Sequence, residues 1–280
     1  RKTSLTHQEP LTVPDQTTCL IIGGNGFVGS GIRDAARDCG WDVSVADHTS
    51  YVSFAGQTFD IVINANGNAK RFHADRDPLF DFDASAASVY KSLFDFPCSK
   101  FALISTVDVY NRPDHRQTTQ EDTAIDPLPL GPYAFHKWLA ERFVMRHQTP
   151  WQVFRLAQMV GTGLRKGPIF DLLHGQPLWI HNESRLHYMN TRQIGAAICA
   201  LIEHAPANEV YNVCGRGTVE FQSVLDLFPQ DRHPARENCA RQCYNVDTSR
   251  TQQWYALPDS WNEVRAFVEE SLRNKPDLRD

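Results

Sequence analysis

The 280-residue sequence lacks a long hydrophobic run, and its apolar segments have only the length of buried core elements. No segment approaches the roughly 18 apolar residues of a membrane-spanning helix. Residues 1–16 are polar and lack the apolar stretch of a signal peptide. The sequence therefore predicts no membrane partner, a mobile tail over residues 1–16 and a cytoplasmic location.

Basic residues are also not in excess, because 28 Lys and Arg stand against 33 Asp and Glu, with a formal net charge of −5. We therefore expect no nucleic-acid partner.

The seven cysteines are odd in number and scattered, which is typical of reduced thiols rather than of a disulfide framework. Cys239 and Cys243, with His233 upstream, allow a zinc site. No second close pair accompanies them, so we predict no metal.

What the sequence does contain is an alternation of short apolar runs and helical periods. The expected buried strands are residues 18–22, 41–46, 60–63, 101–104 and 153–156. The expected helices between them are residues 27–39, 80–94 and 133–147. This order is typical of an α/β protein with a Rossmann-like, doubly wound parallel sheet.

Beyond residue 160 the pattern loosens, although further elements are expected. They are helices at 169–174, 191–203, 221–227 and 261–272, and strands at 178–181 and 210–213. We predict a dinucleotide-binding Rossmann domain over residues 17–160. A small C-terminal substrate lobe over residues 161–280 follows it, with residues 190–215 returning to the Rossmann domain.

A glycine-rich segment follows the first expected strand and opens the first expected helix. Gly24, Gly26 and Gly29 have the spacing that allows a tight turn, close approach of a pyrophosphate and helix–strand packing, respectively. The helix N-terminus then offers N–H groups to the phosphates. A glycine turn without a ligand is the alternative, which the strand–turn–helix context disfavours. The predicted cofactor-binding residues here are Gly23, Gly24, Asn25, Gly26, Phe27, Val28 and Gly29.

Asp47 ends the second expected strand, where a carboxylate binds the hydroxyl groups of the cofactor's adenosine ribose. A carboxylate at this position repels the additional phosphate of NADP. No Arg or Lys follows directly, so we expect NAD, with NADP less favoured. NADP is the alternative, because His48 is close enough in sequence to lie near its 2′-phosphate.

Tyr133 and Lys137 lie one helical turn apart on the same face of an expected helix. A phenol ordinarily has a pKa of about 10, and a nearby ammonium lowers it. Tyr133 is therefore a candidate general acid or base for a carbinol or ketone. Thr106 closes an expected strand, where its hydroxyl can enter the cleft at the carboxyl end of the sheet.

These segments resemble the extended short-chain dehydrogenase/reductases, and more narrowly their nucleotide-sugar epimerase, dehydratase and reductase branch. The resemblance rests on residues 23–29, 104–110 and 131–137, and it extends over about residues 18–228. It implies an NAD-dependent enzyme whose catalytic residues are Thr106, Tyr133 and Lys137. Lys137 also holds the nicotinamide ribose in that family. The residues that the resemblance places beside the cofactor are Asn64, Ala65, Asn66 and Gly67, together with Tyr133 and Lys137.

The resemblance also implies a homodimer formed through the helices at 80–94 and 133–147.

Two departures from the family pattern affect the fold and the reaction. The segment between Asp47 and Asp60 is too short for the usual third strand, which we expect to be reduced or missing. Val107 replaces the first of two acids that follow the threonine in the dehydratases, which leaves only Asp108 and disfavours a 4,6-dehydratase.

Two further departures concern charged positions. Asp83 stands near a position where the family often has asparagine. Arg192 and Gln193 replace an acidic pair. We predict Asp108, Arg185 and Arg192 as substrate-binding residues, with either arginine facing a substrate diphosphate. The alternative for each arginine is a solvated surface position.

The sequence thus predicts an NAD-dependent oxidoreductase or epimerase that moves a hydride to or from a sugar carbon. The expected substrate is a small molecule, a nucleotide sugar. A ketoreductase acting on a non-sugar substrate is one alternative. The other is a non-catalytic dinucleotide-binding sensor or scaffold, which is disfavoured because such proteins commonly lose the tyrosine or the lysine.

Overall fold

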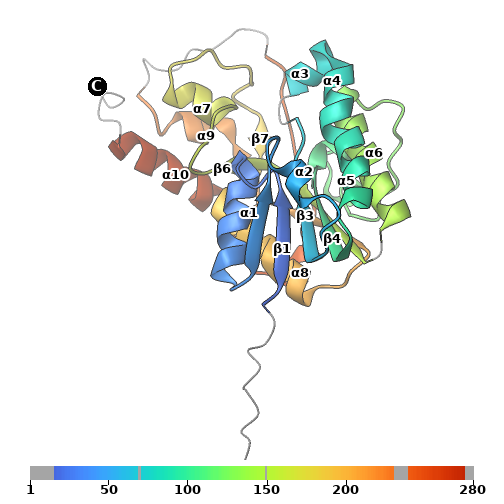
Figure 1. The fold of residues 1–280 in the computed structure, drawn as a ribbon. Coiled ribbons are helices and arrows are strands. Elements are labelled where there is room, and N and C mark those ends of the chain that lie inside the picture. The colour runs from blue at the N-terminus through green and yellow to red at the C-terminus, as the bar shows by residue number, and fades with distance from the viewer. Residues whose placement is uncertain (1–15, 69–70, 149, 230–238, 275–280) are drawn as a thin grey trace, which may run out of the picture.

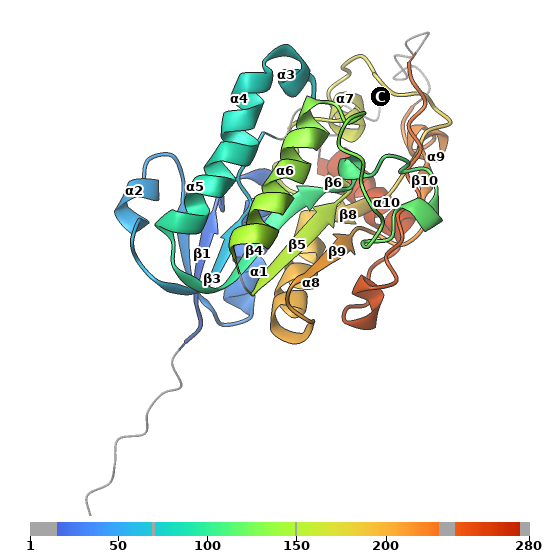
Figure 2. The same cartoon turned by 90° about the vertical axis from the view of Figure 1, so that its right-hand side faces the viewer.

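A computed structural model describes residues 16–68, 71–148, 150–229 and 239–274. Its centre is a parallel sheet of six strands in the order β2-β1-β3-β4-β5-β9 (Figures 1 and 2). The strands are β1 (Thr18–Ile22), β2 (Asp42–Ala46), β3 (Phe59–Asn64), β4 (Cys98–Thr106), β5 (Trp151–Leu156) and β9 (Glu209–Val213). The predicted α/β class with a Rossmann-like parallel sheet is confirmed.

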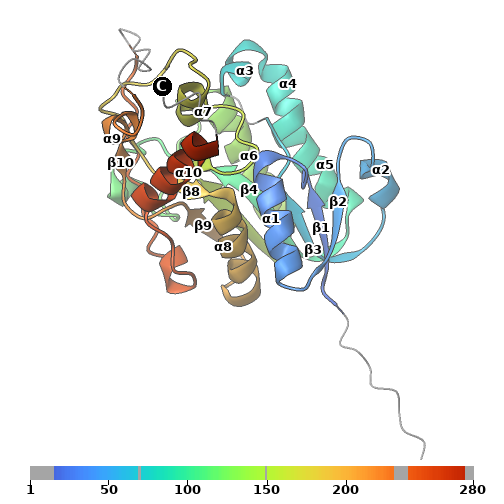
Figure 3. The ribbon, with the colours of Figure 1, turned by 90° about the vertical axis from the view of Figure 1, so that its left-hand side faces the viewer.

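The strands form where apolar residues occupy both faces, because helices cover the sheet on both sides. In β1, Cys19 and Ile21 face one helical layer, whereas Leu20 and Ile22 face the other. The first layer contains α1 (Phe27–Asp38) and α8 (Thr191–His204), which Figure 3 shows side by side. The second contains α5 (Ser88–Asp95) and α6 (Pro132–His147) (Figure 2).

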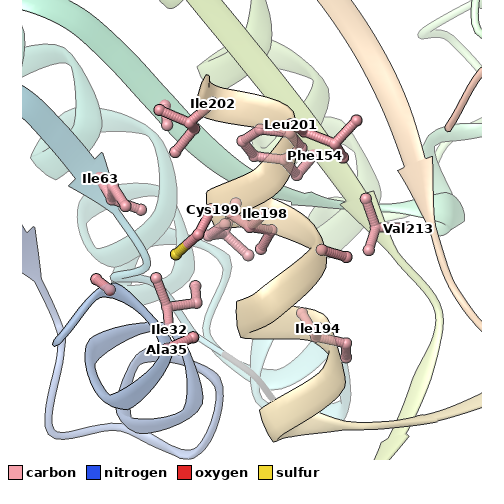
Figure 4. Packing of buried hydrophobic residues seen from close by; sticks show 14 of the residues in the cluster. Ile32, Ala35, Ile63, Phe154, Ile194, Ile198, Cys199, Leu201, Ile202 and Val213 are labelled. Carbon is pink, nitrogen blue, oxygen red and sulfur yellow. The ribbon is translucent and has the colours of Figure 1, made fainter. Parts of the chain in front are cut away.

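Helices α1 and α8 touch through their backbones. A Cβ added to Gly31 would lie 2.3 Å from the carbonyl oxygen of Thr191, and one on Gly195 would lie 2.2 Å from that of Gly31. Around this contact Ile32, Ile198 and Cys199 pack against the sheet (Figure 4). The short distance lets both helices lie flat on the same face.

The third strand of the usual fold is missing. Residues 47–58 are all described, and they contain only the short helix α2 (Tyr51–Phe54). As a result β2 is the edge of the sheet, and this expectation from the sequence is confirmed.

The expected helix at 80–94 is interrupted. Pro78 opens α4 (Pro78–Phe82) after Asp77, which caps the helix by accepting the Phe80 N–H at 3.0 Å. A π-helical turn (Asp83–Ala87) then joins α4 to α5. Residues 80–94 are thus helical as predicted, but the π-helical turn within them was not foreseen, because a helical period does not reveal an inserted residue.

The C-terminal lobe packs three helices around its own apolar core. Its elements are β6 (Gln158–Val160), α7 (Pro168–Leu173), β7 (Arg185–Leu186), β8 (Tyr188–Asn190), β10 (Val219–Glu220), α9 (Phe221–Leu225) and α10 (Ser260–Asn274). The predicted strand at 178–181 is wrong. Leu178 and Ile180 are buried in the lobe core, but they pair with no strand.

Of the predicted tail, only Gln16 lies within the described residues, and its side-chain amide donates to the carbonyl of Gly40 at 2.6 Å. His233 lies outside the described residues. All seven cysteines are described and have free thiols. No described helix combines the length and the hydrophobicity needed to cross a bilayer.

Candidate active site

The site is centred where the direction of the sheet reverses. From β1 the chain continues to β2 on one side, while β3 continues to β4 on the other. The carboxyl ends of β1 and β3 therefore border the switch point, where open α/β sheets bind ligands. The glycine-rich segment follows β1, and residues 65–68 follow β3.

The glycine-rich segment has the shape that a phosphate requires. Gly23 has φ 78°, one residue before the glycine to which the motif assigns the turn. A Cβ on Gly29 would lie 2.1 Å from the carbonyl oxygen of Gly23. Any residue larger than glycine at this position would therefore push α1 away from the end of β1. Gly26 is the N-cap of α1, which has no side-chain cap and no acidic residue in its first turn. The helix N-terminus is therefore open to an anion.

Asp47 lies at the carboxyl end of β2, beside the glycine-rich segment. Its Oδ1 accepts hydrogen bonds from Thr49 and Ser50, which hold the pKa of the carboxyl well below its usual range. Its Oδ2 accepts from the Asn25 side chain at 3.3 Å. The carboxylate is thus ionised and oriented, with Oδ2 turned toward the segment that would hold the pyrophosphate.

Replacing Asp47 by alanine is expected to weaken NAD binding about 10- to 100-fold, because a charge-assisted hydrogen bond to a hydroxyl contributes about 1.5–3 kcal/mol. NADP binding should change little, because the same substitution removes a repulsion. Calorimetric titration of both nucleotides measures the difference. Asp42→Ala, at the other end of β2, is the matched control. An equal loss for both nucleotides contradicts the ribose assignment.

The residues after β3 form a loop that is hydrogen-bonded to β1 and α5. The Asn64 side chain is buried, donating to Ser92 Oγ at 2.9 Å and accepting the Asn66 N–H at 3.0 Å. The Ala65 N–H donates to the carbonyl of Ile22 at 2.9 Å. These bonds hold the loop against β1, and they bring Gly67 next to the ammonium of Lys137.

Thr106, Tyr133 and Lys137 converge at the carboxyl end of β4. Thr106 is the last residue of β4, and its hydroxyl accepts the Asp108 N–H at 3.2 Å and lies beside the Tyr133 phenol. Tyr133 lies in the first turn of α6, which Gly131 caps and Pro132 opens. Lys137, one turn on, donates from Nζ to the carbonyl of Ile104 at 3.3 Å.

The phenol of Tyr133 is neutral in this environment. Burial raises its pKa, and the carboxylate of Asp108 raises it further. The guanidinium of Arg71 and the hydrogen bond with Thr106 act in the opposite direction. Arg71 is thus a cation beside the phenol that the sequence did not predict.

Arg71 belongs to a cluster that joins three distant parts of the chain. It opens α3 (Arg71–Arg76), forms an ion pair with Asp108 and donates to the hydroxyl of Tyr244 at 2.6 Å. That hydroxyl donates to Asp108 Oδ1 at 2.7 Å. No local pattern could have identified Tyr244, because only the fold brings it to Asp108. A basic residue soon after a strand end was the available signal for Arg71.

Tyr244 also lines an open cavity of about 690 Å³ that contains both Arg185 and Arg241. Each arginine has a half-exposed acidic partner, Glu220 at 3.6 Å and Glu183 at 3.4 Å, respectively. Such exposed pairs contribute little free energy, so a phosphate can compete for the guanidinium groups.

Arg192 lies elsewhere, on α8, with 81 % of its side chain exposed and Asp38 as its partner at 3.7 Å. It is not among the residues that line this cavity. Within the described ranges, no group of three or more His, Cys, Asp or Glu side chains is placed to hold a metal ion.

The residues fit a dinucleotide along the carboxyl edge of the sheet. The uncapped N-terminus of α1 suits the pyrophosphate, and Asp47 suits the adenosine ribose. Gly67 leaves space beside Lys137, since a Cβ there would lie 2.9 Å from Nζ.

Comparison with known proteins gives one family and many similar folds. The family model described as the NAD dependent epimerase/dehydratase family matches residues 19–214. A UDP-galactose 4-epimerase structure has a TM-score of 0.75 and 18% identity, covering 92% of this chain and 99% of that chain. Comparison of the sequence with curated proteins finds no match.

Two further structures have similar folds. One is UDP-glucuronic acid 4-epimerase from Bacillus cereus in complex with UDP-glucuronic acid and NAD (TM-score 0.73, 16% identity, 92% and 99% coverage). The other is RMD from Pseudomonas aeruginosa complexed with NADPH (TM-score 0.72, 17% identity, 92% and 98% coverage). At these identities the likeness concerns the fold.

Proposed function

The chain belongs to the NAD-dependent epimerase/dehydratase family, and from this premise we propose that it moves a hydride to or from a carbon of a nucleotide sugar. The convergence of Thr106, Tyr133 and Lys137 beside the glycine-rich segment is the observation that carries the proposal. NAD is the favoured cofactor because Asp47 ends β2. The similar B. cereus epimerase holds NAD and a UDP-sugar, which agrees with both choices.

The chain's own residues supply the proton chemistry. Bound NAD would supply the hydride acceptor and donor, and Lys137 would hold its nicotinamide ribose. To act as a base, Tyr133 must first ionise, which the guanidinium of Arg71 favours. The phenolate would then take the proton of the sugar hydroxyl as that carbon is oxidised, and the phenol would give it back on reduction. Thr106 would orient the phenol.

The remaining polar groups would orient the substrate. Arg71 and Asp108 lie near the phenol of Tyr133 and are joined by Tyr244, and these three residues would bind sugar hydroxyls. Arg185 and Arg241, in the adjoining cavity, are placed to bind the diphosphate. The negatively charged molecule thereby offers local positive charge where the anionic substrate enters.

A panel of nucleotide sugars, incubated with and without added NAD or NADH, tests the function. We expect conversion of at least one member. A product formed without net change in nicotinamide absorbance identifies epimerisation, and a stoichiometric change identifies a dehydrogenase or reductase. Conversion of non-sugar ketones alone would favour the alternative ketoreductase, and nucleotide binding without any turnover would favour a sensor.

We also propose that two copies associate through α5 and α6. Tyr90, Phe94, Phe143 and His147 form a cluster of contacting rings on these helices. Phe94 remains 62 % exposed, and Leu79 and Phe80 on the adjoining α4 are also exposed. Exposed apolar groups in this number are typical of an interface.

The protein is therefore expected to sediment as a dimer, and Phe94→Glu is expected to convert it to a monomer by placing a charge in the interface. Val52→Glu is the matched control, because Val52 is also an exposed apolar residue but lies on α2. Analytical ultracentrifugation at micromolar concentration gives the result. A monomeric wild-type protein contradicts the proposal.

A further inference from the structure

A fully buried carboxylate, Asp81, lies on α4 behind the predicted catalytic lysine. Its Oδ2 is 2.6 Å from Nδ1 of His136 on α6. Its Oδ1 accepts hydrogen bonds from Asn68 Nδ2 at 2.8 Å and from Ser85 Oγ at 3.4 Å. Three segments thus converge on one carboxylate, which no motif in the sequence indicates.

The ammonium of Lys137 occupies the same enclosed region, and the residue is only 6 % exposed. Its Nζ lies 2.9 Å from the point that a Cβ on Gly67 would occupy, and Ser85 Oγ lies 3.4 Å from that point. The hydroxyl of Ser85 is therefore close to the ammonium of Lys137 and to the carboxylate of Asp81. The same hydroxyl accepts the backbone N–H of Asn68 at 3.1 Å.

A buried ammonium is costly unless a negative charge compensates it. Burial lowers the pKa of Lys137 to about 8, and Asp81 is the charge that opposes this most, followed by Glu141. Glu141 is already bound by Arg155 through two nitrogens. His136 and Tyr133, the other titratable groups near Lys137 on α6, carry no fixed negative charge.

We propose that Asp81 is a positioning residue, whose carboxylate, held by His136, Asn68 and Ser85, keeps the ammonium of Lys137 charged and in place for the cofactor ribose. The inference rests on the proposed role of Lys137 in binding the cofactor. It adds to that role a reason why a lysine excluded from water remains a cation near neutral pH.

The pH dependence of NADH affinity tests this inference and needs no knowledge of the substrate. In the wild-type protein the affinity should fall as the pH rises through about 8, because Lys137 then loses its proton. Asp81→Asn should move this fall to lower pH by about one unit, since it removes the compensating charge. Asp83→Asn, exposed two residues further on, is the matched control and should leave the profile unchanged.

Lys137→Met separates this inference from the proposed function. The substitution should weaken NADH binding and remove the fall near pH 8. If it leaves NADH binding unchanged, the proposed role of Lys137 is wrong. If Lys137→Met acts as expected but Asp81→Asn keeps the wild-type profile, Asp81 has no positioning role.

The variant Asp81→Asn could fail to fold, and a double variant then decides. Adding Lys137→Met to Asp81→Asn removes the uncompensated ammonium, so the double variant should have a higher Tm than Asp81→Asn alone. A purely structural role of Asp81, through His136 and Asn68, predicts no such rescue. If the loss of Tm in the double variant equals the sum of the losses in the two single variants, the inference is wrong.

Discussion

Replacing Tyr133 by phenylalanine is expected to lower kcat by about 10²- to 10⁴-fold, the range that a general acid or base contributes. Only the phenolic oxygen is lost, so the dissociation constant for NAD should change by less than about twofold, because the ring stays in place and the other predicted cofactor-binding residues are unchanged. Steady-state kinetics with the converted nucleotide sugar, together with calorimetric titration of NAD, measure both effects.

Tyr244→Phe provides a matched control in the same cluster. It removes the hydroxyl that lies 2.7 Å from Asp108 and 2.6 Å from Arg71. This hydroxyl is proposed to orient the sugar and to transfer no proton, so the substitution should raise KM more than it lowers kcat. If Tyr133→Phe retains its activity, Tyr133 is not the acid/base. If the two variants lose kcat equally, the phenol of Tyr133 has no special role.

The largest expected effect on stability concerns Glu141 on α6. Its carboxylate is fully buried and binds Nε and Nη2 of Arg155 at 3.0 and 2.7 Å. It also accepts the hydroxyl of Ser105 at 2.5 Å. Glu141→Gln leaves the buried guanidinium without a counter-charge, so the free energy of unfolding should fall by about 3–5 kcal/mol.

Chemical denaturation measures this loss, and Glu269→Gln is the control. Glu269 forms a pair with Arg265 at 2.7 Å on the exposed side of α10, and such a pair contributes less than about 1 kcal/mol. The double variant Glu141→Leu/Arg155→Met should recover most of the stability, because apolar groups can replace a buried ion pair. Equal losses for Glu141→Gln and Glu269→Gln contradict the expected role of the buried pair.

The central sheet was predictable because its strands are covered on both faces. Runs such as residues 19–22 are apolar at every position, which few structures other than a buried parallel strand require. Leu178 and Ile180 show the limit of this reasoning. Their alternation correctly indicates burial, but burial in the lobe core needs no strand partner.

The local parts of the site were also predictable, since the glycine spacing lies within one turn and the start of the helix that follows it, and the Tyr133–Lys137 spacing lies within one helix. The parts that remained hidden depend on contacts between distant segments. Tyr244 reaches Asp108, and Asp81 reaches His136, only after the fold has formed. The π-helical turn after α4 was hidden too, because an inserted residue leaves the hydrophobic pattern almost unchanged.

The close contact between Gly31 on α1 and Thr191 on α8 can form only after the later helix has been synthesised. A ribosome adds roughly 5–20 residues per second, so α1 leaves the exit tunnel on the order of ten seconds before α8 is made. Throughout this interval Ile32 and Ala35 lack the helix that covers them, and β5 lacks its outer neighbour β9. The N-terminal half contains every predicted catalytic residue, yet during translation it depends on the later part of the chain to bury its apolar surface.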